Sequence, residues 1–145
     1  MQLPELKAPR LDHYRDGSDD RALRLLSEAR LHERVLGSPH RNLDSYLGCV
    51  VEDDRIVRLA LKRYSKSLYD RLQRETKEEF TPQQRTACMN QIQAAVEHLN
   101  SLGLAHNDIS PPNIMFDNTG QAVLTDLDSC APLGEILTKG ELVTG

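Results

Sequence analysis

The sequence predicts an α+β fold, and three of its features support that prediction. Two long segments have apolar residues at helical spacing, and short apolar runs come in pairs that are typical of antiparallel hairpins. Helices and strands are mixed along the chain but do not alternate regularly, which favours α+β over α/β. With 145 residues, of which 39% are hydrophobic and 28% charged, the chain has the size and balance of one globular domain or part of one.

Charge and apolar patterning argue against several classes of protein. Lys and Arg number 18 against 22 Asp and Glu, giving a net charge of -4, whereas nucleic-acid binders usually carry a basic surplus. No apolar run approaches the length of a membrane span, and residues 1–10 lack the apolar core of a secretory signal. The three cysteines form no C-x-x-C pair. We therefore expect an intracellular, cytoplasmic protein with no nucleic-acid or membrane partner.

The residue pattern of the first half of the chain predicts a helix followed by a hairpin. The helix runs from Ser18, a good N-cap, along an apolar stripe to Leu36, and a Gly-Ser-Pro sequence ends it. Tyr46–Val51 and Ile56–Leu61 are predicted strands, joined by an acidic turn at residues 52–54.

The residue pattern of the second half of the chain predicts two helices and a second hairpin. The helices are Ser67–Arg74 and Thr81–Leu102, and the second begins with a capping box of Thr81 and Gln84. Two short strands, Asn113–Phe116 and Ala122–Asp126, are joined by a turn at residues 117–120. The Pro-Pro pair before the first of these strands predicts an extended loop.

Residues 104–130 contain a spacing of polar residues that indicates a catalytic site. His106-x-Asp108 is followed five residues later by Asn113, and Asp126 comes thirteen residues after that. Phosphoryl transfer needs a carboxylate and an amide to hold magnesium, and another carboxylate to meet the attacking hydroxyl. A loop and the end of a hairpin can bring these groups into one cleft.

These residues resemble motifs of the eukaryotic protein-kinase-like family. His106-Asn107-Asp108 is similar to the catalytic-loop H-R-D with Asn113 downstream, and Asp126-Leu127-Asp128 is similar to D-F-G. The Asn at 107 and the Asp-Ser-Cys after Leu127 are similar to small kinase-like proteins of fungi. The resemblance implies that Asp108 orients the acceptor hydroxyl and takes its proton, with Asn113 as the second catalytic residue. It also implies that Asn113 and Asp126 bind Mg²⁺.

The resemblance extends to the nucleotide site. Leu6-Lys7-Ala8 is similar to the end of the strand that carries the phosphate-binding lysine, and Glu28 falls where the family has the glutamate that pairs with it. The family then implies that Lys7, held by Glu28, touches the α and β phosphates of ATP. The backbone from Lys62 to Tyr64 would receive the adenine ring, so ATP and Mg²⁺ are the expected cofactors.

The same comparison predicts one truncated protein-kinase-like domain over residues 1–145. Residues 1–64 would be a remnant of the N-lobe, and residues 65–145 the first half of the C-lobe, with the family's C, D and E helices. Only six residues precede Lys7, there is no glycine-rich loop, and no A-P-E sequence follows Asp126. Such a domain would leave core surfaces uncovered, and we expect them to contact a protein substrate or another protein partner.

Three functions remain open at this point. The first is ATP- and Mg²⁺-dependent phosphoryl transfer to protein hydroxyls, impaired by truncation. The second is a catalytically dead pseudokinase or interaction fragment, which the missing glycine loop favours. The third is a small-molecule phosphotransferase of the aminoglycoside or choline kinase type, which also uses H-N-D with a downstream Asn.

Overall fold

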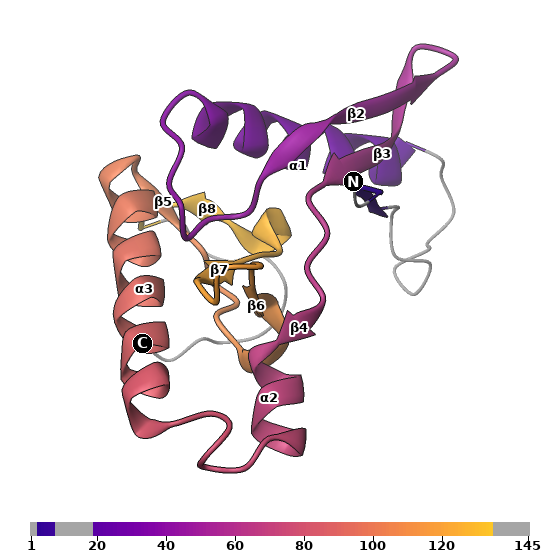
Figure 1. Ribbon diagram of the computed structural model, residues 1–145. Helices are drawn as coiled ribbons and strands as arrows, with labels where there is room; N and C mark the ends of the chain where they lie inside the picture. The colour runs from indigo at the N-terminus through magenta and orange to yellow at the C-terminus, as the bar shows by residue number, and fades with distance from the viewer. Residues whose placement is uncertain (1–2, 8–18, 135–145) are drawn as a thin grey trace.

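A computed structural model describes residues 3–7 and 19–134 of the chain (Figure 1). It contains short antiparallel strands and three α-helices within these ranges, which confirms the predicted α+β class. The strands are β1 (Glu5–Lys7), β2 (Tyr46–Glu52), β3 (Arg55–Leu61), β4 (Lys66–Ser67), β5 (Leu104–Ala105), β6 (Ile114–Phe116), β7 (Ala122–Leu124) and β8 (Ala131–Pro132). The helices are α1 (Asp19–Leu36), α2 (Leu68–Arg74) and α3 (Pro82–Ser101), with 3-10 turns η2 (Pro111–Asn113) and η3 (Leu127–Ser129).

The first sheet has the strand order β1-β3-β2, and helix α1 packs on it. Strands β2 and β3 form the predicted hairpin, but its turn is one residue shorter than expected because Glu52 pairs with Arg55. The two turn residues, Asp53 and Asp54, both have left-handed φ values of 50° and 60°. Two successive left-handed residues match the right-handed twist of a hairpin, and Asp tolerates that conformation.

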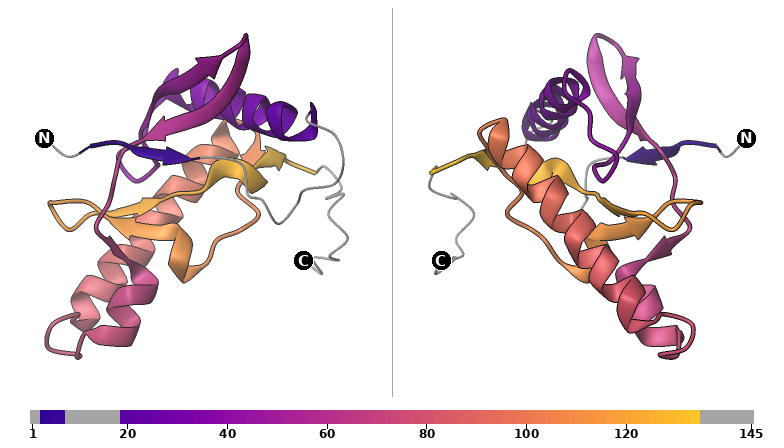
Figure 2. Two further views of the ribbon diagram at one scale, coloured as in Figure 1. Left: turned by 90° about the vertical axis from the view of Figure 1, so that its right-hand side faces the viewer. Right: turned by 60° about the vertical axis from the view of Figure 1, so that its left-hand side comes forward.

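Two clusters of buried side chains form the core. In the first, α1 packs Leu25 and Ala29 against Tyr46, Leu59 and Leu61 of the sheet. The second lies between α3, the β6–β7 hairpin and the end of α1, and it is larger. Its members are Val35, Leu43, Leu68, Phe80, Cys88, Ile92, Ala95, Leu99, Leu104, Ile114, Phe116, Ala122, Leu124 and Leu127. Figure 1 shows α3 standing nearly upright along one side of this second part of the molecule, and Figure 2 shows it crossing that part diagonally, with the first sheet and α1 above.

Helix α3 begins with the predicted capping box. The Thr81 hydroxyl accepts from the Gln84 N–H at 3.2 Å, and the Gln84 side chain accepts from the Thr81 N–H at 3.0 Å. Gly103 follows the helix with φ +78°, where glycine avoids the strain of a side chain. Met89 is the one large apolar side chain that α3 exposes, so short strands cover its apolar stripe, and the expectation of uncovered core surfaces does not apply to this helix.

Apolar side chains are exposed instead around the first sheet. Leu6 of β1, Leu23 and Leu36 of α1, and Leu47 and Val51 of β2 are all exposed. The expectation of an uncovered surface therefore applies to this end of the molecule, and Tyr69 and Leu72 of α2 are exposed as well. None of the helices in residues 19–134 combines the length and apolar character needed to cross a membrane.

Some predicted boundaries near the motif are wrong. The Pro-Pro pair opens the 3-10 turn η2 rather than an extended loop, because the φ of proline suits both conformations and the Asn113 N–H donates to Ser110 O at 2.9 Å. Asn113 therefore lies in η2, and β6 starts one residue later. Strand β7 ends at Leu124, short of the expected Asp126, because Asp126 has φ +62°, which breaks a strand.

Candidate active site

The loop that follows β5 is held in place by His106, which is 3% exposed. Its Nδ1 accepts from the Asp108 backbone N–H at 3.2 Å, and its Nε2 lies 2.8 Å from Thr125 O. Since Nδ1 accepts, Nε2 carries the proton and donates it to Thr125. His106 thus ties the loop to the segment between β7 and Asp126 and holds it in position.

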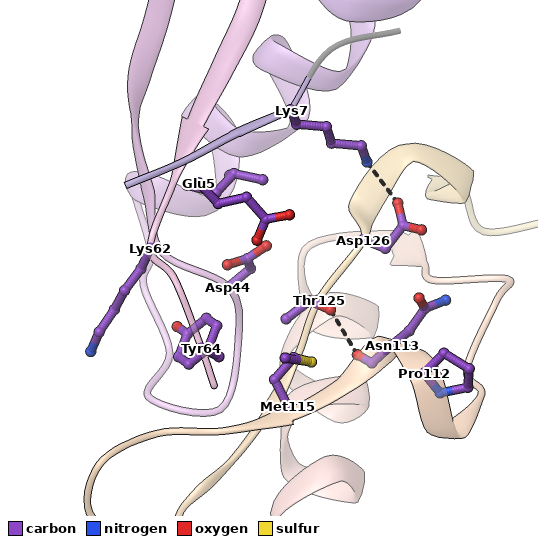
Figure 3. Close-up of a pocket in the computed structure, with 11 residues that line it drawn as sticks. Glu5, Lys7, Asp44, Lys62, Tyr64, Pro112, Asn113, Met115, Thr125 and Asp126 are labelled. Atoms are coloured by element: carbon purple, nitrogen blue, oxygen red, sulfur yellow. Dashed lines mark hydrogen bonds and ion pairs between the residues drawn. The ribbon is translucent and has the colours of Figure 1, made fainter. Parts of the chain in front are cut away.

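The second link between these two segments is Asn113. Its side-chain Nδ2 donates to the backbone O of Asp108 at 2.9 Å and to the Asp108 carboxylate at 3.0 Å. The Thr125 N–H and hydroxyl both donate to Asn113 O, at 2.8 and 3.0 Å (Figure 3). Because Nδ2 donates to Asp108, the side-chain oxygen of Asn113 is the atom that can accept a hydrogen bond or bind a cation. The structure therefore brings Asp108, Asn113 and the chain leading to Asp126 together.

Lys7 joins the first sheet to this motif. Its Nζ donates to Glu28 Oε1 at 2.8 Å and to Asp126 Oδ1 at 2.7 Å, so the implied ion pair with Glu28 is present (Figure 3 shows the contact with Asp126). Glu28 is 5% exposed and stands on the inner face of α1. Three residues that are remote in sequence therefore meet at one ammonium group.

The charges in this group stabilise one another. Burial disfavours the Lys7 ammonium, but the Glu28 carboxylate and hydrogen bonds to Asp126 and Glu28 outweigh burial and raise the pKa of Lys7. Burial would likewise raise the pKa of Glu28, but its contacts with His32 and Lys7 lower it below the ordinary value. Lys7 is therefore a fixed positive charge at the inner end of the site.

The donor set around Asp126 suits a divalent cation. Mg²⁺ is commonly held by one or two protein oxygen ligands together with substrate phosphates, and Asp126 and Asn113 offer a carboxylate and an amide oxygen. Burial and a hydrogen bond to Asp126 raise the pKa of Asp128 to about 6, so two carboxyl groups crowd together here. A cation would relieve that crowding. Within residues 3–7 and 19–134, no three His, Cys, Asp or Glu side chains form a metal-binding group by themselves.

These residues line a cleft of about 340 Å³ between the first sheet and the β6–β7 hairpin (Figure 3). Figure 3 shows Lys7, Asn113 and Asp126 toward one end and Tyr64 and Met115 toward the other, and Leu61 also lines the cleft. The remaining lining residues are Glu5, Asp44, Lys62, Pro112 and Thr125. A cleft with one ionic and one apolar end can hold a ligand that has a charged part and a flat, less polar part.

The two residues proposed for the adenine end behave differently. Tyr64 lines the cleft, and burial together with the nearby charge of Asp44 raises its pKa to about 12, so it stays a neutral phenol. Lys62 also borders the cleft, but Figure 3 shows its side chain directed away from the other lining residues. Its backbone N–H donates to Ser45 O at 2.9 Å. Within the backbone segment from Lys62 to Tyr64, the N–H of Lys62 therefore already donates a hydrogen bond to another part of the protein.

Sequence reasoning missed Asp44 and Glu5, whose carboxyl groups face each other in the cleft (Figure 3). A signal for Asp44 existed, since it is a lone acid two residues before the strand that begins at Tyr46. His32 was missed as well, although it lies seven residues after Leu25 on the buried side of α1, where helical spacing places it. Its ring stacks on Tyr46 at 5.1 Å, and its Nε2 lies 3.7 Å from Glu28 Oε1.

Comparison with known proteins agrees with this geometry. The family model described as "Protein kinase domain" matches residues 7–141. Among curated proteins of Arabidopsis thaliana, "Serine/threonine-protein kinase UCNL" is 42% identical over 38 residues, which is 26% of this chain and 9% of the relative. "Serine/threonine-protein kinase UCN" is 40% identical over 42 residues, 28% of this chain and 10% of the relative. The matched segments thus span about a tenth of these relatives. Since the family model covers most of the residues that build the cleft, this chain belongs to the protein kinase domain family.

Proposed function

We propose that this chain binds a nucleoside triphosphate with Mg²⁺ in the cleft and transfers the terminal phosphoryl group to a protein hydroxyl. The observation that supports this most is the position of Lys7, which Glu28 holds against Asp126 at the polar end of the cleft. A fixed ammonium beside a carboxylate and an amide is the arrangement that phosphate groups and their cation need.

Each residue then has a separate task. Lys7 donates to phosphate oxygens, and Asn113 and Asp126 hold the cation, which when bound neutralises charge on the phosphates. Asp108 does not line the cleft, but it is exposed and contacts the cleft-lining Asn113, so a protein hydroxyl that reaches it can give up its proton there. Asn113 keeps the Asp108 carboxylate in place through its Nδ2 contact of 3.0 Å. Catalysis would rest on positioning and charge, because no covalent bond to the protein is needed.

The choice of a protein hydroxyl as acceptor rests on relatives. The similar plant proteins carry the names of serine/threonine-protein kinases, and the family model is that of protein kinases. This supports a protein acceptor over an aminoglycoside or choline. We further propose that residues 1–145 act as one unit, because the cleft is lined by residues from both ends of the described chain, Glu5 to Asp126.

Nucleotide binding is tested by thermal unfolding of the whole chain with and without millimolar Mg-ATP. We expect ATP to raise the Tm of the wild type and to raise it far less for Asp126→Asn. The matched control is Asp54→Asn, since Asp54 has nearly the same left-handed φ (60° against 62°) but lies at the exposed hairpin tip. A wild-type Tm that does not respond to Mg-ATP would refute the proposal.

Transfer is tested separately, with γ-labelled ATP and a library of Ser-, Thr- and Tyr-containing peptides. We expect label in peptide with the wild type and with Asp54→Asn, and none with Asp108→Asn. Nucleotide binding without any transfer would identify the chain as a nucleotide-binding pseudokinase and would refute the catalytic part of the proposal.

A further inference from the structure

Between Lys7 and Tyr64 the cleft contains an acidic side chain, that of Asp44, whose polar atoms are only partly satisfied (Figure 3). Asp44 lines the cleft together with Leu61, Tyr64 and Met115. Its Oδ1 is buried and has no hydrogen-bond partner among the residues that the structure describes. A buried, unpaired carboxyl oxygen is costly for a folded protein, and such groups usually have a ligand or another function.

The backbone holds Asp44 firmly in this position. Its N–H donates to Leu124 O at 3.0 Å, and Asn42 O accepts from the Leu124 N–H at 2.8 Å, so the segment is pinned to strand β7. The Asn42 side chain, 3% exposed, adds a third contact to Ala122 O at 2.8 Å. The backbone of Asp44 therefore cannot move away from the cleft without breaking a buried network.

The position of Lys7 decides which part of a nucleotide would meet Asp44. If phosphates lie against Lys7 and Asp126, the base is left with the part of the cleft toward Tyr64 and Met115. These side chains suit the flat faces of a purine, and Asp44 meets the edge of the ring. Figure 3 shows the Asp44 carboxyl between Lys7 and Tyr64, facing Glu5.

We propose that Asp44 determines which bases the cleft accepts, by taking a hydrogen bond from an exocyclic amino group on the purine edge. This inference rests on the proposed nucleotide binding. An N–H group of the base would satisfy the buried Oδ1, whereas a base without an amino group would leave it unpaired. A site with a buried polar group rejects analogues that cannot pair with it far more strongly than an apolar pocket does.

The experiment compares ATP with purine riboside triphosphate, which has the same ring and phosphates but no amino group. Dissociation constants are measured with Mg²⁺ by calorimetry for the wild type, Asp44→Leu, Asp44→Asn and Asp54→Asn. We expect the wild type and Asp54→Asn to bind ATP at least about tenfold more tightly than the analogue, the size of effect that a hydrogen bond to a charged group gives. In Asp44→Leu this ratio should fall by about tenfold, while Asp44→Asn, which keeps an acceptor oxygen but lacks the charge, should fall between Asp44→Leu and the wild type.

The outcomes separate the two proposals. If ATP binds but the ratio is the same in Asp44→Leu as in the wild type, the role of Asp44 is refuted and nucleotide binding stands. If neither triphosphate binds the wild type, the proposed function fails, and the inference about Asp44 fails with it. Binding of both ligands by Asp44→Leu shows that this variant has folded.

Discussion

Replacing Asp44 by Asn should stabilise the protein, and more so as the pH rises. Burial raises the pKa of Asp44 from an ordinary 3.8 to about 7. Between these two values the folded state binds a proton that the unfolded state does not, so the free energy of unfolding falls as the pH increases. A shift of about 3 units at about 1.4 kcal/mol each corresponds to ~4 kcal/mol of stability lost by pH 8.

Asn cannot ionise, so the Asp44→Asn variant avoids this loss. Its advantage over the wild type should grow by about 2–3 kcal/mol between pH 5 and pH 8. The charged and titratable groups that face Asp44 are Glu5 and Lys7 of β1, His32 of α1 and Tyr64 after β3. They are present in both proteins, so comparison at each pH isolates Asp44 itself.

The measurement is urea unfolding followed by far-UV circular dichroism at pH 5, 6, 7 and 8, with Asp54→Asn as the control. Asp54 is exposed, and its variant should differ from the wild type by the same small amount at every pH. If the Asp44→Asn advantage is equal at pH 5 and pH 8, the carboxyl is not desolvated and the description of the cleft given above is wrong.

Further predictions concern the ion pairs, a helix cap and the core, all read from urea unfolding. Lys7→Met should lower the free energy of unfolding by about 3 kcal/mol, because it leaves the buried Glu28 without its cation. The double variant Lys7→Met/Glu28→Leu should recover most of that loss, and a double variant as unstable as Lys7→Met would count against an electrostatic cause. Thr81→Ala should cost about 1 kcal/mol through the lost cap of α3, whereas Thr86→Ala, in the exposed part of the same helix, should cost less. Phe80→Ala should cost about 3–5 kcal/mol, since its ring is fully buried and packs edge-on against Phe116 at 6.0 Å; a loss below 1 kcal/mol would contradict that packing.

Local signals in the sequence were sufficient for the long helices and for the first hairpin. The capping box at Thr81, the helical spacing of Ile92 and Leu99, and the acidic turn before Arg55 each depend on residues close together in the chain. The two-residue strands β4, β5 and β8 were not predicted, because they do not depend on local signals. Such strands are too short to have a pattern of their own, and their existence depends on partners far away in sequence.

The same distinction between local and long-range signals applies to the residues of the candidate site. Spacing alone identified Asp108, Asn113 and Asp126 as a group, and their contacts within residues 106–126 follow from one loop and one hairpin. Asp44 and Glu5 could not be found in this way. They reach the cleft through pairing of β1 with β3 and through the hydrogen bonds of residues 42–44 to β7.

The sequence by itself therefore determined the helices, the first hairpin, the motif and the family, because helix caps, turns and motif spacing are properties of neighbouring residues. Tertiary structure decided that Lys7 is shared between Glu28 and Asp126, and that the carboxyl group of Asp44 is desolvated. Both depend on burial and on distances between side chains remote in sequence. The strength of a charge interaction is set by those distances and by the exclusion of water, and a linear pattern contains neither.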